Sequence, residues 1–195
     1  MIAPLGFSPQ DSAVARSLLG LADLPTVVAL GPFDDLAHAE QLAAAFTAVR
    51  RRCNAQFVLF GTGVHRAAII RRTFAQGVPS SVHVVPEDRW PDLVAAADLI
   101  VPSTASGLRR LLEVLAAGRP VVAPVNPTTV RLVVPSSAGL VYRPGDVSGM
   151  AGALLRLLTT PSLRHGMACR AREVARRHHT RQIRLYEPER EKEHA

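Results

Sequence analysis

Short apolar runs alternate along this chain with longer segments in which apolar residues recur at helical spacing. We interpret the runs as strands, and they cover residues 26–30, 56–60, 81–85, 99–101 and 121–123. A continuous apolar run suits a strand that is buried on both faces of a parallel sheet. The segments between the runs are predicted as helices, so the pattern indicates successive βαβ units of an α/β protein.

The clearest βαβ unit covers residues 98–125. Its first strand leads into a loop of small residues, 103–107, and then into a helix that Gly118 ends. Such a loop leaves room for a phosphate to approach the unpaired N–H groups at a helix N-terminus, where the helix dipole is positive. Taken alone, the loop favours a plain turn in which Ser103 or Ser106 caps the helix.

Pro102-Ser103, Glu113 and residues 116–122 stand around this loop. Together these residues resemble the core motif of retaining, nucleotide-sugar-dependent glycosyltransferases of the group 1 type, which have the two-domain GT-B fold. Pro102-Ser103 matches the start of the motif, and residues 116–122, Ala-Ala-Gly-Arg-Pro-Val-Val, match its end. Glu113 matches the second glutamate of the motif, which in the family holds the ribose hydroxyls of the donor. Ala105 stands where the family has its first glutamate, whose carboxylate touches the donor sugar.

The resemblance extends from Pro4 to about Tyr186 and implies the C-terminal, donor-binding half of such an enzyme, without the N-terminal acceptor-binding domain. The implied fold is a single Rossmann-like three-layer α/β/α domain with a mainly parallel sheet of about six strands. We expect a linker and short helix over residues 1–24, the Rossmann-like glycosyltransferase domain over residues 25–178, and a charged C-terminal tail or helix over residues 179–195.

Two helices are expected at the ends of this domain. The first covers about residues 10–20. Its buried face is expected to consist of Leu18, Leu19 and Leu21. The last begins at Pro161 and is expected to end at about His178, before a segment of mixed charge that we expect to fray.

The turn after the first strand departs from the family at two positions. The family has an Arg and a Lys there, which grip the donor diphosphate, and this chain has Pro32 and Ala37 in their places while Gly31 is kept. Charge-assisted hydrogen bonds from two cations are therefore missing at these positions. His38 is interpreted as a solvated loop residue rather than as a replacement cation.

The candidate site is a donor-binding site, with no assigned catalytic residue, no metal, and no cofactor apart from the nucleotide-diphosphate sugar, which is a substrate. The candidate donor-binding residues are Gly31, Thr104, Ala105, Ser106, Gly107, Leu108 and Glu113. Arg109 and Arg110 follow the loop. Two positions are open to them, facing the donor phosphates or on the solvent side of their helix, and we favour the second. Trp90, the only tryptophan, is interpreted as an anchor within or at the edge of the core.

Composition narrows the classes of function. Of the 195 residues 48% are hydrophobic, and the formal net charge of +7 favours anionic partners, although we attribute it to an Arg-rich composition. A glycine-rich fingerprint and a basic-aromatic motif are both missing, which argues against a nicotinamide-dependent enzyme and against a nucleic-acid binder. The chain has two cysteines, which we expect to be free thiols. We also expect a cytoplasmic protein, because the sequence has no apolar run of membrane-spanning length and no basic-then-apolar leader.

Two functions remain open. The first is a glycosyltransferase-like donor-binding domain, truncated or working with a separate acceptor-binding domain, that transfers a hexose from a nucleotide-diphosphate sugar. The second is a catalytically inactive glycosyltransferase-like protein that keeps the fold for binding or assembly. In either case we expect the isolated chain to be inactive as an enzyme. A lone lobe exposes apolar surface, so we expect an acceptor-binding partner or a homodimer, and peripheral membrane contact stays open.

Overall fold

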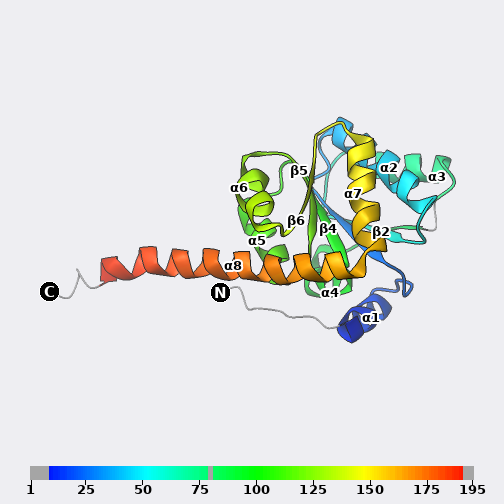
Figure 1. Cartoon of the computed structure of the whole chain (residues 1–195). Helices are drawn as coiled ribbons and strands as arrows, with labels where there is room; N and C mark the ends of the chain where they lie inside the picture. Colours follow the sequence, from blue (N-terminus) through cyan, green and yellow to red (C-terminus); the bar gives the residue numbers. More distant parts are fainter. Residues whose placement is uncertain (1–8, 79–80, 191–195) are drawn as a thin grey trace.

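The centre of the structure is a six-stranded sheet in which each neighbouring pair of strands is parallel (Figure 1). The computed structural model describes residues 9–78 and 81–190. The strands are β1 (Thr26–Leu30), β2 (Gln56–Phe60), β3 (Val82–Val85), β4 (Leu99–Pro102), β5 (Val121–Pro124) and β6 (Gly139–Tyr142). Their order is β3-β2-β1-β4-β5-β6, so the direction of winding reverses between β1 and β4. This arrangement confirms the predicted Rossmann-like fold and places a ligand-binding crevice at the carboxyl ends of the central strands.

Helices cover both faces of this sheet (Figure 1). They are α1 (Pro9–Leu18), α2 (Leu36–Arg50), α3 (Arg66–Ala75), α4 (Trp90–Ala96), α5 (Leu108–Ala116), α6 (Pro127–Ser136), α7 (Val147–Thr159) and α8 (Pro161–Arg190), with a 3-10 turn, η2 (Glu87–Arg89), before α4. Buried residues of α2, α3 and α7 share one hydrophobic cluster, and those of α1, α4, α5 and α6 share the other. The protein therefore has the three-layer architecture that the sequence predicted.

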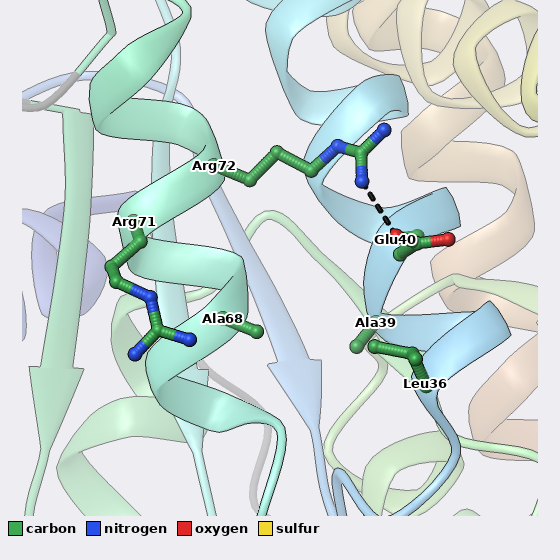
Figure 2. Close-up of a pocket in the computed structure, with 6 residues that line it drawn as sticks. All are labelled: Leu36, Ala39, Glu40, Ala68, Arg71 and Arg72. Carbon is green, nitrogen blue, oxygen red and sulfur yellow. Dashed lines mark hydrogen bonds and ion pairs between the residues drawn. The ribbon is translucent and has the colours of Figure 1, made fainter.

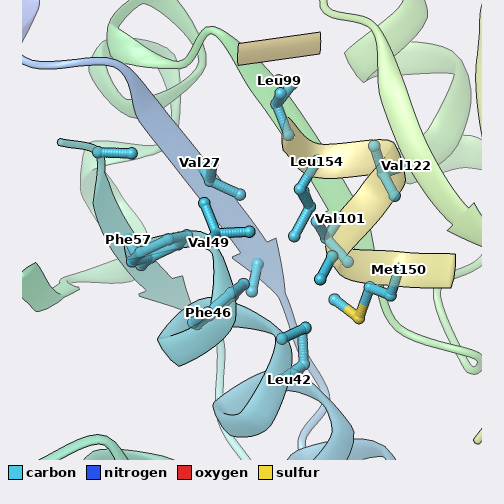
Figure 3. Close-up of a cluster of buried hydrophobic side chains, with 14 of the residues drawn as sticks. Val27, Leu42, Phe46, Val49, Phe57, Leu99, Val101, Val122, Met150 and Leu154 are labelled. Atoms are coloured by element: carbon cyan, nitrogen blue, oxygen red, sulfur yellow. The ribbon is translucent and has the colours of Figure 1, made fainter. Parts of the chain in front are cut away.

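Alternate residues of β1 face opposite layers of this architecture. Val27 belongs to the cluster beneath α2 and α7, whereas Val28 belongs to the cluster on the other face. Figure 3 shows the first cluster, in which Phe46 of α2 stacks on Phe57 of β2 with 4.2 Å between the ring centroids. Burial of both faces explains the continuous apolar sequences of β1, β2, β4 and β5.

The predicted buried face of α1 was wrong in part. Leu18 is 61% exposed, whereas Leu19 and Leu21 pack on the second cluster but lie beyond the end of the helix. The helix instead buries Ser12 and Ala15, and it packs against α4. Because the helix ends at Leu18, Leu19 and Leu21 are not on its face, whereas Ser12 and Ala15 are three residues apart within it, the spacing of neighbours on one face.

The predicted end of the last helix at His178 was also wrong, because α8 continues to Arg190 and extends away from the sheet (Figure 1). Within its described side chains, Glu173 accepts hydrogen bonds from Arg177 at 2.6 Å and from Arg176 at 2.9 Å. Ion pairs between side chains three and four residues apart stabilise an exposed helix. The charged side chains in this part of α8 therefore stabilise the helix and do not end it.

No helix was predicted from the sequence for the residues of α6. Asn126 Oδ1 accepts a hydrogen bond from the N–H of Thr129 at 2.9 Å, and Thr129 Oγ1 accepts one from the N–H of Asn126 at 3.0 Å. Pro127 occupies the first turn, where a missing N–H costs no helical hydrogen bond. The Asn-Pro-Thr-Thr sequence is a reciprocal capping box, which is the signal that could have predicted this helix.

Candidate functional site

The turns after β1 and β2 pack directly against each other at the carboxyl edge of the sheet. The N–H of Gly31 donates to Phe60 O at 2.8 Å, and the N–H of Phe33 donates to Thr62 O at 2.9 Å. A Cβ at Gly31 would lie 2.9 Å from Thr62 O, and one at Gly63 would overlap the backbone of Phe33. The two glycines therefore allow the close contact that fixes both turns.

A cavity of about 250 Å³ lies over these turns. Its lining consists of Leu30, Gly31, Pro32, Phe60, Gly61, Thr62, Glu87 and Arg110. Its position at the carboxyl ends of β1 and β2 is where open α/β sheets bind ligands. The volume suits one moiety of a nucleotide, because pockets for whole drug-sized ligands are larger. The cavity brings Gly31, from the predicted site, together with Arg110, which was not predicted for it.

Arg110 is exposed, as predicted, with 44% of its side-chain surface accessible, but it also lines this cavity. The guanidinium carbon lies 4.3 Å from the centroid of the Trp90 ring. Trp90 in turn packs against Phe60, with 5.1 Å between the ring centroids. This packing at the edge of the core confirms the predicted anchoring role of Trp90, and it directs Arg110 toward the site. The side chain of Arg109 is 91% exposed, as predicted.

Glu113 lies one turn further along α5, and the two arginines bind both of its carboxylate oxygens. Arg110 Nη1 donates to Oε2 at 2.9 Å, and Arg109 Nε donates to Oε1 at 3.1 Å. The Glu113 side chain is 22% exposed. An ionised carboxylate has about four lone-pair positions. Glu113 can therefore still accept hydrogen bonds from the hydroxyl groups of a ligand while it holds both arginines in place.

The loop before α5 lies at the carboxyl end of β4, but it does not line the cavity. Four residues of this loop and the first residue of α5 are candidate site residues: Thr104, Ala105, Ser106, Gly107 and Leu108. Ser106 is half-buried and the other four are exposed. Gly107 occupies the N-cap position of α5 without a side-chain capping bond, so the predicted serine cap was wrong. The hydroxyls of Ser103 and Ser106 instead lie 3.1 Å apart, within hydrogen-bonding distance of each other. The first N–H groups of α5 thus have no serine hydroxyl over them.

His38 is buried and not a solvated loop residue, so that interpretation was wrong. It lies in the first turn of α2, with 5% of its surface exposed. Burial lowers the pKa of His38, and the nearby Asp35 carboxylate offsets part of this effect. Asp35 also caps α2 by accepting from the N–H of Ala37 at 2.9 Å. A neutral, buried imidazole that does not line the cavity does not replace a phosphate-binding cation.

A second hollow lies between α2 and α3, where Arg72 Nη1 and Glu40 Oε1 form an ion pair at 2.6 Å (Figure 2). None of the candidate site residues lines this groove. Within residues 9–78 and 81–190, no three His, Cys, Asp or Glu side chains are placed to hold a metal ion. Along the same part of the chain, we find no helix long and apolar enough to cross a bilayer.

The parallel sheet with helices on both faces defines a Rossmann-like α/β domain. The chain belongs to the family described as "Glycosyl transferases group 1", whose sequence model matches residues 24–160. An alpha-D-kanosaminyltransferase from Streptomyces kanamyceticus is 30% identical to it over 162 residues, which are 80% of this chain and 42% of that enzyme. The chain thus spans less than half the length of this curated relative.

Solved structures confirm the fold assignment. The Anabaena protein HepE, solved in complex with UDP and glucose, superposes with a TM-score of 0.76 at 20% identity, over 89% of this chain and 49% of that chain. The C-terminal domain of LpcC, a group 1 glycosyltransferase family protein from Francisella tularensis, gives a TM-score of 0.73 at 15% identity. This second match covers 89% of this chain and 93% of that domain, so the present fold corresponds to the C-terminal domain of LpcC.

Proposed function

We propose that this chain binds a nucleotide-diphosphate sugar at the carboxyl edge of its sheet and serves as the donor-binding part of a hexosyltransferase. The observation that carries the proposal is the cavity beside Gly31, with Arg110 at its edge and Glu113 one turn further along the same helix. Glu113 provides lone pairs for sugar hydroxyls, and Arg110 provides positive charge. Family membership and the UDP and glucose bound to HepE support this class of ligand.

Sugar transfer requires a second domain in this proposal. The donor and the acceptor must be held against each other in a site from which water is excluded. The described residues form one wall of such a site, because the cavity opens at one edge of a single sheet. In this proposal the acceptor is bound by residues other than those described, in a further domain of the same protein, in a separate partner or in a second copy.

Calorimetric titration of the chain with UDP, GDP and ADP tests the proposal. Binding of one of them in the wild type, weakened by Glu113→Gln, is the expected result. Glu173→Gln is a matched control, because Glu173 also binds two arginines within one turn of its own helix but lies on α8, away from the cavity. Glu173→Gln should leave nucleotide binding unchanged. Equal losses in both variants would mean that Glu113 acts only through helix stability.

A second candidate function is a catalytically inactive protein that keeps this fold for binding or assembly. The observation that favours it is the uncharged character of Pro32, Ala37 and Ala105, at three positions where the family has charged donor-binding residues. This alternative predicts no binding of UDP, GDP or ADP at millimolar concentration, with or without an acceptor-binding partner.

A further inference from the structure

We propose that Arg110 is the residue that binds the phosphate groups of the nucleotide, an inference that rests on the proposed nucleotide-binding function. Among the residues that line the cavity, Arg110 carries the only positive charge and Glu87 the only negative charge. A nucleoside diphosphate brings at least two negative charges into the site. A guanidinium is well suited to compensate them, because its planar array of N–H donors matches the oxygens of a phosphate.

The contacts of Arg110 leave donors available for this role. The guanidinium has five N–H donors, of which Nη1 is used in the hydrogen bond to Glu113. Among the described residues, Glu113 is the one acceptor that Arg110 contacts. Nε and Nη2 can therefore donate to phosphate oxygens without breaking the ion pair with Glu113. Helix α5 thus places a residue that binds phosphate, Arg110, beside a residue that binds hydroxyl groups, Glu113.

The surroundings of Arg110 also hold it in position before a ligand arrives. Its guanidinium lies over the Trp90 ring, and Trp90 is fixed by Phe60 at the end of β2, a strand whose turn forms the floor of the cavity. A side chain that is already ordered loses less conformational entropy on binding. Arg109 has the same charge and the same carboxylate partner, but its side chain is 91% exposed and it does not line the cavity.

This pair of neighbouring arginines gives a matched experiment. Arg110→Gln and Arg109→Gln each remove one positive charge, and each leaves Glu113 with one arginine partner. UDP and uridine are titrated into both variants and the wild type. GDP with guanosine, and ADP with adenosine, are titrated in parallel. Arg110→Gln is expected to weaken UDP binding by about 10- to 100-fold, the range for a charge-assisted hydrogen bond, and to leave uridine binding unchanged. Arg109→Gln should leave both affinities within about twofold of the wild type, because exposed charges are screened.

Several outcomes would overturn the assignment. UDP affinity that is unchanged in Arg110→Gln, or reduced equally in Arg109→Gln, would refute the role of Arg110 while leaving the nucleotide site intact. An equal loss of UDP and uridine binding would assign Arg110 to the nucleoside and not to the phosphates. A wild-type chain that binds none of these ligands would overturn the proposed function together with this inference.

A conservative variant keeps the test decisive if Arg110→Gln unfolds the domain. Arg110→Lys retains the charge but loses the planar donor array, so it should retain part of the preference for UDP over uridine. Loss of that preference to the same degree in a folded Arg110→Lys and a folded Arg110→Gln would show that donor geometry outweighs charge. A preference for UDP over uridine in Arg110→Lys that equals the wild-type preference would refute the proposal, whether or not Arg110→Gln folds.

Discussion

Asp98 and Arg16 form an ion pair that joins α1 to the amino-terminal end of β4. Arg16 Nη2 lies 3.1 Å from Asp98 Oδ2, and the two side chains are 11% and 17% exposed. The same carboxylate oxygen accepts a hydrogen bond from the N–H of Thr26 at 2.8 Å, and Arg164 of α8 lies 3.4 Å from Oδ1. One carboxylate therefore connects the first helix, two central strands and the last helix.

Asp98→Ala is expected to lower the free energy of unfolding by about 3 kcal/mol, because it leaves two largely buried arginines and a backbone N–H without their shared acceptor. Chemical denaturation of the wild type and the variant measures this loss. Glu40→Ala is the control, since the Glu40–Arg72 pair is 49% exposed on both sides and should contribute less than about 1 kcal/mol. Similar losses in the two variants would show that burial of the Asp98 cluster contributes nothing.

The stability of the protein should fall as the pH is lowered below about 6.5, in part because of His38. Burial lowers the pKa of His38 below its value of 6.5 in the unfolded chain, so the unfolded state binds the proton more tightly. Stability from neutral His38 is therefore fully present above the unfolded pKa and is lost as the pH falls toward the folded pKa. Half-buried His83 acts in the same direction, since burial lowers its pKa as well.

His38→Leu removes one of these titrating groups, and it should reduce the difference in melting temperature between about pH 7.5 and pH 5.5. His83→Gln, measured separately, shows how much of the remaining pH dependence arises from β3. An unchanged pH dependence in His38→Leu would contradict the buried, neutral state of this imidazole.

The sequence was sufficient to predict elements whose residues depend on local pattern. Of the five strands predicted from apolar runs, β1, β2, β4 and β5 are buried throughout, whereas β3 is partly exposed at the edge of the sheet. A helix cap is a local signal of the same kind: the Asp146 side chain accepts from Gly149 N at 2.7 Å at the start of α7. The position of the Arg110 side chain beside the cavity was not predictable in this way. It depends on the contact with Trp90 and, through Trp90, on Phe60 of β2. The burial of His38 likewise depends on how α2 packs, which no local pattern reports.

Gly63→Ala should destabilise the protein and disturb the cavity. Gly63 has a φ of +139°, and a Cβ there would overlap the backbone of Phe33, so the turns after β1 and β2 would have to separate. Gly20→Ala is the matched control, because its φ is +66° but a Cβ there would meet open space. Strain from positive φ alone costs about 1 kcal/mol. Denaturation of Gly63→Ala should show a loss of about 2 kcal/mol beyond that of Gly20→Ala, and equal losses would mean that the turns do not depend on their close contact.

The emission of Trp90 should report ligand binding directly. Trp90 is the only tryptophan of the chain, and the guanidinium of Arg110 lies 4.3 Å from the centroid of its ring. A phosphate group bound to Arg110 would change the electrostatic field at the indole, so UDP should shift or quench the emission while uridine has a smaller effect. Excitation at the long-wavelength edge of tryptophan absorption avoids absorption by the nucleobase. The change should saturate at the affinity found by calorimetry and should be lost in Arg110→Gln but kept in Arg109→Gln. UDP that binds by calorimetry without any change in this emission would place the nucleotide away from Arg110.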